Sequence, residues 1–441
     1  MKILVAGGGG REHAIAWRLS CDAERHELFA APGNAGMEGV AKCIDIKADD
    51  TERLPAWAKE NGIDLVVVGP EAPLVKGLAD ELANAGIPVF GPVAAGARIE
   101  GSKSFAKEIM SAAGVPTGKA EVFTDVEAAK AALPGYGLPV VIKADGLAAG
   151  KGVVVAETLE DACAAIDDML VANRFGAAGA QVLVEEFLHG EECSILAMVD
   201  GERAVLLPSS QDHKRVFDGD KGPNTGGMGA YSPAPVVDSG SLKFIHDKIV
   251  MPVVHELKSR GIVYRGILYA GLMVNENPDG PSPNSTVKNH LASSGSKINV
   301  VEFNARFGDP ETEAVLPRIG GDFAKALLNA ATGRLSEDDV KVEDLVAATV
   351  ILASAGYPGE YAKGKPIGGL DAEAEGTVVF HCGTKRADGG IVTNGGRVLS
   401  VTGTGSTLRE AVDRAYARAD AISFDGKYCR RDIAARAFGR G

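Results

Sequence analysis

The sequence lacks the features that mark membrane, exported and nucleic-acid-binding proteins. No apolar run approaches the ~20 residues that span a bilayer, and Met1 is followed by Lys2 and the strand-like ILVA rather than by an export signal. Lysine and arginine number 46 against 59 acidic residues, giving a formal charge of −13. Because nucleic-acid phosphates require a basic face, this balance argues against such a partner. We expect a cytoplasmic protein without membrane contact.

Closely spaced cysteines and internal repeats are also missing. The six cysteines stand apart, at positions 21, 43, 163, 193, 382 and 429. This spacing argues against a disulfide framework or a zinc knuckle and favours a reducing compartment. At 441 residues the chain is too long for one ordinary core, so we expect about two to four domains.

The first hundred residues alternate short apolar runs with helical patterns. The runs are ILVA, ELFAA, KCIDI, IDLVVVG and IPVFG, and helical patterns cover residues 11–20 and 73–86. Strands that alternate with helices predict a parallel sheet with crossover helices, which is an α/β domain. Ligands of such sheets bind at the carboxyl ends of the strands.

Four glycines follow the first strand and precede a helix, so backbone N–H groups there could cradle a phosphate. The dinucleotide fingerprint G-x-G-x-x-G fails, because Glu12 stands at its third glycine position. A nicotinamide site and a tight turn without any ligand stay open as alternatives. Asn34 and Glu71 follow other strands of the same sheet and could complete a phosphate site.

A second region begins near Gly101 and contains a glycine-rich loop between two strands. In VVIKADGLAAGKGVVV, Lys143 ends one strand and Lys151 lies in the loop. Such a loop could clamp a polyphosphate, since glycines permit close approach and lysines supply charge. A plain surface hairpin is the alternative. In VLVEEFLHGEE, Glu192 could bind ribose hydroxyls, although solvated acids at a strand end would look the same.

The run VVEFN offers a metal site. Glu302 and Asn304 are two apart on a predicted strand, so both side chains project from one face. Carboxylate and amide oxygens suit Mg²⁺, and we place Arg306 on the same face, where it could hold a carboxylate or a phosphoryl oxygen. A buried polar cluster is the alternative. Residues 211–233, QDHKRVFDGDKGPNTGGMGAYSP, follow neither a helix nor a strand pattern.

Eight segments in order resemble one family. They are GGREHA, PGNAG, VGPEAPLV, EGSKSFAK, VIKADGLAAGKGV, EEFLHGEE, QDHKRVFDGDKGPNTGGMGAYSPAP and VEFNARFGDPET. Their order is similar to that of the phosphoribosylamine–glycine ligase family, also called glycinamide ribonucleotide synthetases, of the ATP-grasp superfamily. The resemblance extends from Met1 to the C-terminal YCRRDIAARA.

The resemblance implies an α/β fold, with α+β character in the ATP-grasp part. Residues 1–102 would form the parallel α/β domain for the sugar phosphate, 103–328 the ATP-grasp region with a mobile flap at about 120–190, and 329–441 a β-rich domain. The implied reaction joins glycine to 5-phosphoribosylamine through a glycyl phosphate, with ATP cleaved to ADP and phosphate. It is the second step of de novo purine synthesis and uses Mg²⁺ or Mn²⁺.

The resemblance also assigns residues to roles. Those implied for ATP are Lys103, Lys143, Lys151, Glu185, Glu186, Phe187, Leu188 and Glu192. Those implied for the sugar phosphate are Gly9, Gly10, Arg11, Glu12, Asn34 and Glu71. The catalytic residues would be Arg306, Asp212 and Lys214, and the metal ligands Glu302 and Asn304. For His213 we favour a structural hydrogen-bonding role over a general base.

Two departures from the family pattern stand out. GILYAGLMV supplies no acidic metal ligand ahead of Glu302, so we assign only two protein ligands. Residues 275–299 form an insertion where relatives have a short turn, and its composition predicts a passive, flexible loop between neighbouring strands. We expect a monomer or a weak homodimer.

Overall fold

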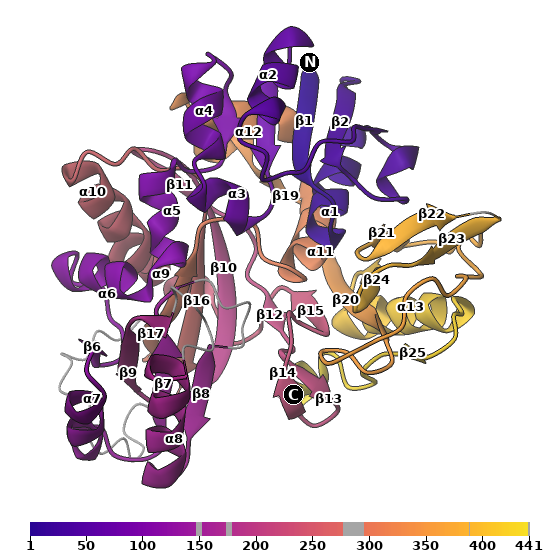
Figure 1. Ribbon diagram of the computed structural model, residues 1–441. Helices are drawn as coiled ribbons and strands as arrows, with labels where there is room; N and C mark the ends of the chain where they lie inside the picture. The colour runs from indigo at the N-terminus through magenta and orange to yellow at the C-terminus, as the bar shows by residue number, and fades with distance from the viewer. Residues whose placement is uncertain (147–151, 173–178, 277–294, 388, 440–441) are drawn as a thin grey trace.

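The computed structural model describes residues 1–146, 152–172, 179–276, 295–387 and 389–439, and Figure 1 shows their arrangement. Lys151 and most of the 275–299 insertion lie outside the described residues. Among the residues described, no helix is both long and apolar enough to cross a bilayer.

The N-terminal domain is the predicted parallel sheet, with strand order β3-β2-β1-β4-β5. Its strands are β1 (Lys2–Gly7), β2 (Glu27–Pro32), β3 (Lys42–Cys43), β4 (Leu65–Val68) and β5 (Val89–Phe90). Its helices are α1 (Gly10–Ser20), α2 (Arg53–Glu60), α3 (Glu71–Val75), α4 (Leu78–Asn84) and α5 (Ala94–Gly101). The helical pattern over 73–86 is divided between α3 and α4, because Gly77 is left-handed, with φ of +89°.

A small antiparallel sheet follows, with order β6-β9-β7-β8 and two helices packed on it (Figure 1). The strands are β6 (Ala120–Phe123), β7 (Val140–Ala144), β8 (Val153–Ala156) and β9 (Val182–Glu186), and the helices are α7 (Val126–Ala132) and α8 (Leu159–Leu170). Ile142, Ile166 and Val184 belong to a hydrophobic core formed by residues of this sheet and its two helices. The unit therefore has its own hydrophobic core, separate from the rest of the chain.

The central antiparallel sheet has order β11-β10-β16-β17 and is buried on both faces. Its strands are β10 (Glu191–Asp200), β11 (Ala204–Leu206), β16 (Arg265–Asn275) and β17 (Lys297–Asn304). Helices α6 (Lys103–Ala112), α9 (Ser239–Ile245) and α10 (Met251–Ser259) accompany it, as do α11 (Glu311–Val315) and α12 (Phe323–Thr332). Ile195 faces one core and Leu196 the other, as alternation along a strand requires.

The pairing of β16 with β17 confirms that the two strands flanking the insertion are neighbours. Asn275 pairs with Lys297 and Tyr269 with Asn304. The register shifts between Gly271, opposite Glu302, and Leu272, opposite Val300, so Val301 is the extra residue of a β-bulge.

The last sheet draws on two separate parts of the chain, in the order β12-β15-β20-β24-β21. Its strands are β12 (Gln211–Asp212), β15 (Gly229–Ser232), β20 (Val346–Ser354), β21 (Thr377–His381) and β24 (Arg397–Gly405), with β25 (Lys427–Tyr428) beside β20. Helix α13 (Leu408–Ala421) packs on β24 and β20. These strands agree with the β-rich C-terminal region that the resemblance implies.

The expectation that residues 211–233 contain no strands is wrong. Besides β12 and β15, the stretch forms a hairpin of β13 (Arg215–Phe217) and β14 (Lys221–Asn224). All four strands are only two to four residues long, and β12 and β15 are buried as a pair. Strands this short and buried give no alternating pattern of apolar and polar residues.

Candidate functional site

The N-terminal part of the site lies where the strand order of the parallel sheet reverses. β1 has β2 on one side and β4 on the other, both parallel to it. Ligands of open parallel sheets bind in the crevice at such a switch point. Gly8, Gly9 and Gly10 follow β1, and Glu71 begins α3 after β4. The structure thus brings together predicted residues that are some 60 positions apart.

Glu12 fills the space between these two strand ends. Its Oε2 accepts from the Gly9 amide at 2.6 Å and its Oε1 from Arg11 Nε at 2.6 Å. A Cβ on Gly7 would lie 2.4 Å from Glu12 Cγ, and one on Gly69 only 2.1 Å from Oε1. Glycine at these positions therefore makes room for Glu12. Its carboxylate orders the start of α1 and leaves other amides of that turn for an anion.

Asn34 links this loop to the C-terminal sheet. Its Nδ2 donates to Gly8 O at 3.0 Å and to His381 O at 2.7 Å, while its Oδ1 accepts from the Gly36 amide at 2.9 Å. The amide side chain is thus bonded within the protein at both ends. Asn34 shapes the glycine loop, and its place beside Gly8 agrees with its predicted location.

A second cluster joins the small antiparallel sheet to the central one. Glu185 on β9 is 2% exposed and forms ion pairs with Lys143 on β7 and Lys107 on α6. Burial alone would raise the pKa of Glu185, but the two ammonium groups outweigh it and hold that pKa below its ordinary value. Lys143 also lies 3.4 Å from the carbonyl of Val301, the bulged residue of β17.

Lys103 starts α6 beside this cluster, and its Nζ donates to Ala144 O and Gly146 O, both at 2.9 Å. Burial lowers its pKa. Phe187 and Leu188 lie between β9 and β10, with the Phe187 ring edge-to-face on His189. Glu186 accepts from the Lys119 amide at 3.2 Å.

The predicted metal ligands lie at the end of β17. Glu302 and Asn304 are half-buried, while Phe303 between them is 2% exposed. The strand therefore places the carboxylate and the amide on the face opposite the core, as alternation predicts.

Arg306 lies two residues beyond the end of β17, so its place on the face of Glu302 and Asn304 stays a prediction. Its Nη2 lies 2.8 Å from Glu100 Oε1 on α5, and its Nε 3.5 Å from Glu71 Oε2. Burial would lower the pKa of Arg306, but these two carboxylates raise it above the ordinary value. The same carboxylates hold the guanidinium between the N-terminal loop and the end of β17.

Residues 212–214 bring a buried aspartate and a half-buried lysine into this region. Lys214 forms an ion pair with Glu192 on β10. Burial, reinforced by Glu311 and Glu192, raises the pKa of Asp212 to about 7 despite the opposing charge of Lys214. Asp212 therefore changes protonation near neutral pH.

His213 lies between these two residues but is turned away from them. Its Nε2 accepts from the Ala434 amide at 3.0 Å, and its Nδ1 lies 3.2 Å from Arg436 Nη2. Both ring nitrogens are thus engaged by the C-terminal segment. This agrees with the structural role favoured for His213.

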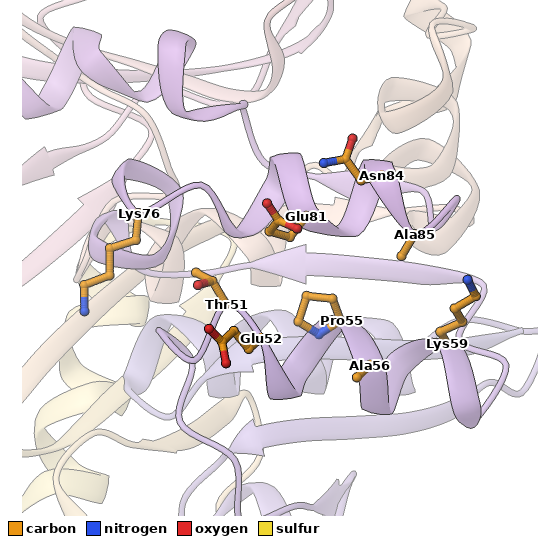
Figure 2. A pocket seen from close by; sticks show the side chains of 9 residues that line it. All are labelled: Thr51, Glu52, Pro55, Ala56, Lys59, Lys76, Glu81, Asn84 and Ala85. Carbon is orange, nitrogen blue, oxygen red and sulfur yellow. The ribbon is translucent and has the colours of Figure 1, made fainter.

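The cavity in Figure 2 lies elsewhere, between α2 and α4 on the outside of the parallel sheet. It is lined by Thr51, Glu52, Pro55, Ala56, Lys59, Lys76, Glu81, Asn84 and Ala85. None of them is a predicted site residue. Most of the predicted site residues lie instead where the small antiparallel sheet, the central sheet and β12 of the last sheet meet. We take this junction as the candidate site.

Three family descriptions match consecutive parts of the chain. They are the phosphoribosylglycinamide synthetase N domain over residues 1–100, its ATP-grasp (A) domain over 101–312 and its C domain over 347–436. The chain belongs to the phosphoribosylglycinamide synthetase family.

Named relatives and solved structures agree with this family over nearly the whole chain. The phosphoribosylamine–glycine ligase of Halalkalibacterium halodurans is 48% identical over 437 residues, which are 99% of this chain and 97% of the relative. The crystal structure of the phosphoribosylamine–glycine ligase of Thermotoga maritima has a TM-score of 0.83 at 34% identity and covers 98% of this chain and 100% of that one. A third structure shares the fold alone: the biotin carboxylase domain of the Hydrogenobacter thermophilus 2-oxoglutarate carboxylase. It has a TM-score of 0.71 at 18% identity and covers 97% of this chain and 91% of that one.

The structure of this phosphoribosylglycinamide synthetase family member adds residues that the sequence analysis missed. They are Lys107, Glu100, Glu311 and Arg397. Glu311 is 3% exposed and accepts from Ser194 Oγ at 3.1 Å and Tyr269 OH at 2.9 Å. Arg397 on β24 lies 2.9 Å from Asp309 and donates to Gly226 O. For Lys107 the one available signal was its place four residues after Lys103 on a helix.

A cluster of Asp22, His26 and Asp322 offers metal-type ligand atoms within 4.8 Å of one another, far in sequence from the site. Asp22 accepts from Arg18 at 2.8 Å and from the amides that begin α12, Phe323 at 3.0 Å and Ala324 at 2.9 Å. A guanidinium and a helix N-terminus are both positive. This environment favours a structural junction between α1 and α12 over a cation site.

Proposed function

We propose that this protein is an ADP-forming ligase that joins glycine to 5-phosphoribosylamine, giving glycinamide ribonucleotide and phosphate in de novo purine synthesis. The observation that carries the proposal is the Lys214–Glu192 ion pair in a chain matched by the family throughout. This pair joins the loop of residues 212–214 to β10. Lys214, which is predicted to be catalytic, thus lies beside Glu192, which is predicted to bind ATP.

ATP would lie between the small sheet and the central sheet. Lys103, Lys143 and Lys151 would bind its phosphates, and Glu192 would bind its ribose. Main-chain groups of Glu186, Phe187 and Leu188 would meet the adenine edge. In this arrangement Glu185 orients Lys143 and Lys107, to which it is already paired.

Glu302 and Asn304 would hold Mg²⁺ or Mn²⁺. Their oxygens are hard donors, half-buried at a strand end, and Lys103 is close enough for its pKa to respond to the charge of Glu302. A metal ion bound there would neutralise charge on the phosphates. Protein side chains would supply the remaining charge stabilisation and the proton acceptor.

The reaction would proceed in two steps. A glycine carboxylate oxygen attacks the terminal phosphorus of ATP, the bond to the ADP oxygen breaks, and glycyl phosphate forms. The amine of phosphoribosylamine then attacks the carbonyl carbon, the amide bond forms, and inorganic phosphate leaves with the bonding electrons. Activation is needed because a free carboxylate is a poor electrophile.

Arg306 and Lys214 would stabilise the charged groups in these steps. Glu100 and Glu71 fix the Arg306 guanidinium, so that it can bind the glycine carboxylate without reorganising. Lys214 would approach the transferring phosphate. Asp212, with its pKa near 7, would take up the proton that the amine loses.

The sugar phosphate would bind at the crevice between β1 and β4. Amides of Gly10 and Arg11 at the start of α1 suit the phosphate, while Gly9, Glu12 and Asn34 shape the loop. Glu71 would face the sugar. We also propose a cytoplasmic monomer or weak homodimer that binds only small molecules, without nucleic acid or membrane.

A coupled ADP assay tests the proposal. It would contain Mg²⁺, ATP, glycine and phosphoribosylamine formed in place from ribose 5-phosphate and ammonia. ADP release should require both glycine and ribose 5-phosphate with ammonia. ADP release that does not depend on glycine, or does not depend on ribose 5-phosphate with ammonia, overturns the proposal. ADP release with another carboxylate or amine would assign a different ATP-grasp ligase. Quenching of nicotinamide fluorescence without ADP binding would favour a dehydrogenase.

A further inference from the structure

The last described residues of the chain lie against the loop that carries Asp212 and Lys214. In Figure 1 the C-terminus is next to β13 and β14, at the foot of the sheet that contains β12 and β15. Helix α14 (Ala435–Phe438) ends the described chain. Residues 430–436, which run into the start of this helix, read RRDIAAR. We call residues 430–436 the C-terminal clamp.

The clamp binds the Asp212 carbonyl and the ring of His213. Arg436 Nη2 donates to the Asp212 carbonyl oxygen at 3.1 Å. The Ala434 amide donates to His213 Nε2 at 3.0 Å, with the Ala434 backbone in a left-handed conformation, at φ of +68°. Asp212 and Lys214 are the neighbours of His213 in the chain. The bonds to the Asp212 carbonyl and to the His213 ring therefore restrict the backbone from which both side chains project.

The clamp also holds the β13–β14 hairpin that follows. The Arg430 side chain is fully buried, and its Nη1 donates to Arg215 O at 3.0 Å and to Asp220 Oδ1 at 2.9 Å. The Gly219 amide donates to Asp432 Oδ2 at 2.8 Å, and the Arg431 amide to Asp218 Oδ1 at 2.8 Å.

Residues 211–213 are buried and the His213 main chain is bonded to Gly229 and Met228, but the β13–β14 hairpin that follows is short. Within the hairpin, Arg215 pairs with Asn224 and Phe217 with Lys221, across a register shift. Phe217 is 51% exposed, and Asp220 is left-handed, at φ of +54°. A hairpin this short is marginal without tertiary support. The buried guanidinium of Arg430 and the bonds of Arg436 supply that support.

We propose that the C-terminal clamp positions the catalytic loop, with Arg436 as the positioning residue that sets the placement of Asp212 and Lys214. The inference rests on the proposed function, because that function gives these two residues their roles at glycine and the transferring phosphate. Displacement of a reacting group by about 1 Å can lower a rate on the order of 100-fold. The glycine end of the site would thus depend on residues more than 200 positions away.

Three substitutions test the clamp. Arg436→Gln removes the positive charge and part of the hydrogen-bonding fork of the guanidinium, whereas Arg436→Lys keeps the charge. Arg431→Gln is the matched control. The Arg431 side chain is half exposed and pairs with Asp420 on α13, away from the loop. Arg436→Gln should lower kcat/KM for glycine roughly 10- to 100-fold while the KM for ATP stays within about threefold. Arg436→Lys should recover part of this loss, and Arg431→Gln should match the wild type.

Hydrogen exchange gives a readout that does not depend on the reaction. Amides of residues 212–220 should exchange faster in Arg436→Gln than in wild type, while those of β7 and β9 stay unchanged. If the exchange and glycine kinetics of Arg436→Gln match wild type, the clamp proposal is overturned. An equal loss in Arg431→Gln overturns it as well.

Two further results separate the clamp from the proposed function. If Arg436→Gln does not fold, Asp220→Asn breaks the ion pairs to Arg430 and Arg436 from a half-exposed position and should give the same exchange pattern. Normal exchange in Asp220→Asn would then count against the clamp. A wild-type protein without glycine-dependent ADP release overturns the proposed function, while its exchange data still decide whether the clamp orders the loop.

Discussion

The negative charge of Glu302 is the simplest property of the site to remove without changing its shape. Glu302→Gln should lower kcat by several orders of magnitude and leave the fold intact, because a ligand charge contributes several kcal/mol to transition-state stabilisation. The measurement is ADP release across a Mg²⁺ titration, with circular dichroism for the fold.

The matched control for this change is Glu202→Gln. Glu202 is exposed and pairs with Lys258 on the surface. It should keep wild-type activity. Unchanged turnover of Glu302→Gln at limiting Mg²⁺ would rule out Glu302 as a ligand.

The raised pKa of Asp212 predicts a pH-dependent cost to stability. Its folded pKa of about 7 lies above the value near 4 of an unfolded aspartate, so the folded state binds the proton more tightly. The stability from this group is present below about pH 4 and is lost as pH rises to about 7. Asp212→Asn should remove this loss, and so be more stable than wild type at pH 8, on the order of a few kcal/mol, with little ligase activity.

Urea unfolding of both proteins at pH 5 and pH 8 measures the effect. The gain of Asp212→Asn over wild type should be smaller at pH 5. A gain that does not change between the two pH values would show that Asp212 titrates normally.

Single residues were predictable where a motif fixed their place on a strand. Glu302 and Asn304 follow from alternation, and Lys143 from the end of a strand. Glu100 and Glu311 were not predictable, because each lies on a helix with no pattern to show which neighbour it faces. Alternation does not fix the place of Arg306, because the strand ends two residues before it.

At the scale of elements, the β16–β17 hairpin gives a sharp test of the insertion. Asn275 and Lys297 form its last pair, so residues 276–296 can be replaced by a two-residue Asn-Gly turn in register. The shortened protein should keep glycine-dependent ADP release. Its stability should change only slightly, because each doubling of loop length costs about 0.6 kcal/mol.

The two measurements are the coupled assay and the thermal midpoint. Loss of activity in a protein that still folds would show that the insertion belongs to the site. A Gly-Gly turn in the same place serves as a control for the turn sequence.

Elements with long apolar runs were predicted well. The five runs of the parallel sheet and the later runs beyond residue 345 all became strands. The four strands within 211–232 were missed. β15 pairs with β20, more than a hundred residues away, and β12 pairs with β15, while β13 and β14 form a very short hairpin with each other. Tertiary context, not local pattern, makes them strands.

At the scale of the whole molecule, the C-terminal sheet docks on the N-terminal domain through two histidines. The His381 amide donates to His13 Nδ1 at 2.8 Å, which requires a neutral ring. Burial, with a smaller effect of His381, lowers the pKa of His13 to about 3. An unfolded histidine titrates near 6.5, so this stability is present above about pH 6.5 and is lost as pH falls towards 3.

His13→Asn keeps an acceptor in place of Nδ1 but cannot titrate. Its thermal midpoint should fall less than that of wild type between pH 7 and pH 5. The matched control is His255→Asn, an exposed position on α10. Equal acid sensitivity of wild type and His13→Asn would show that the docking tolerates a charged ring.

The arrangement of the sheets could be expected only through the family resemblance. Periodicity predicts the parallel sheet, but nothing local shows that residues 211–232 complete the sheet of residues 346–405. The site lies at the junction of three sheets, so its geometry depends on contacts of long sequence separation.

The mixed origin of that last sheet has a consequence for protein synthesis. A ribosome makes β12 and β15 more than a hundred residues before β20, and still longer before the clamp at 430–436. At roughly 5–20 residues per second, the catalytic loop waits for many seconds without the strands that pair with it. A chain that stops before residue 346 would have the small sheet and the central sheet but lack the strands that order residues 212–214. If Asp212 and Lys214 act as proposed, such truncated chains would consume little ATP.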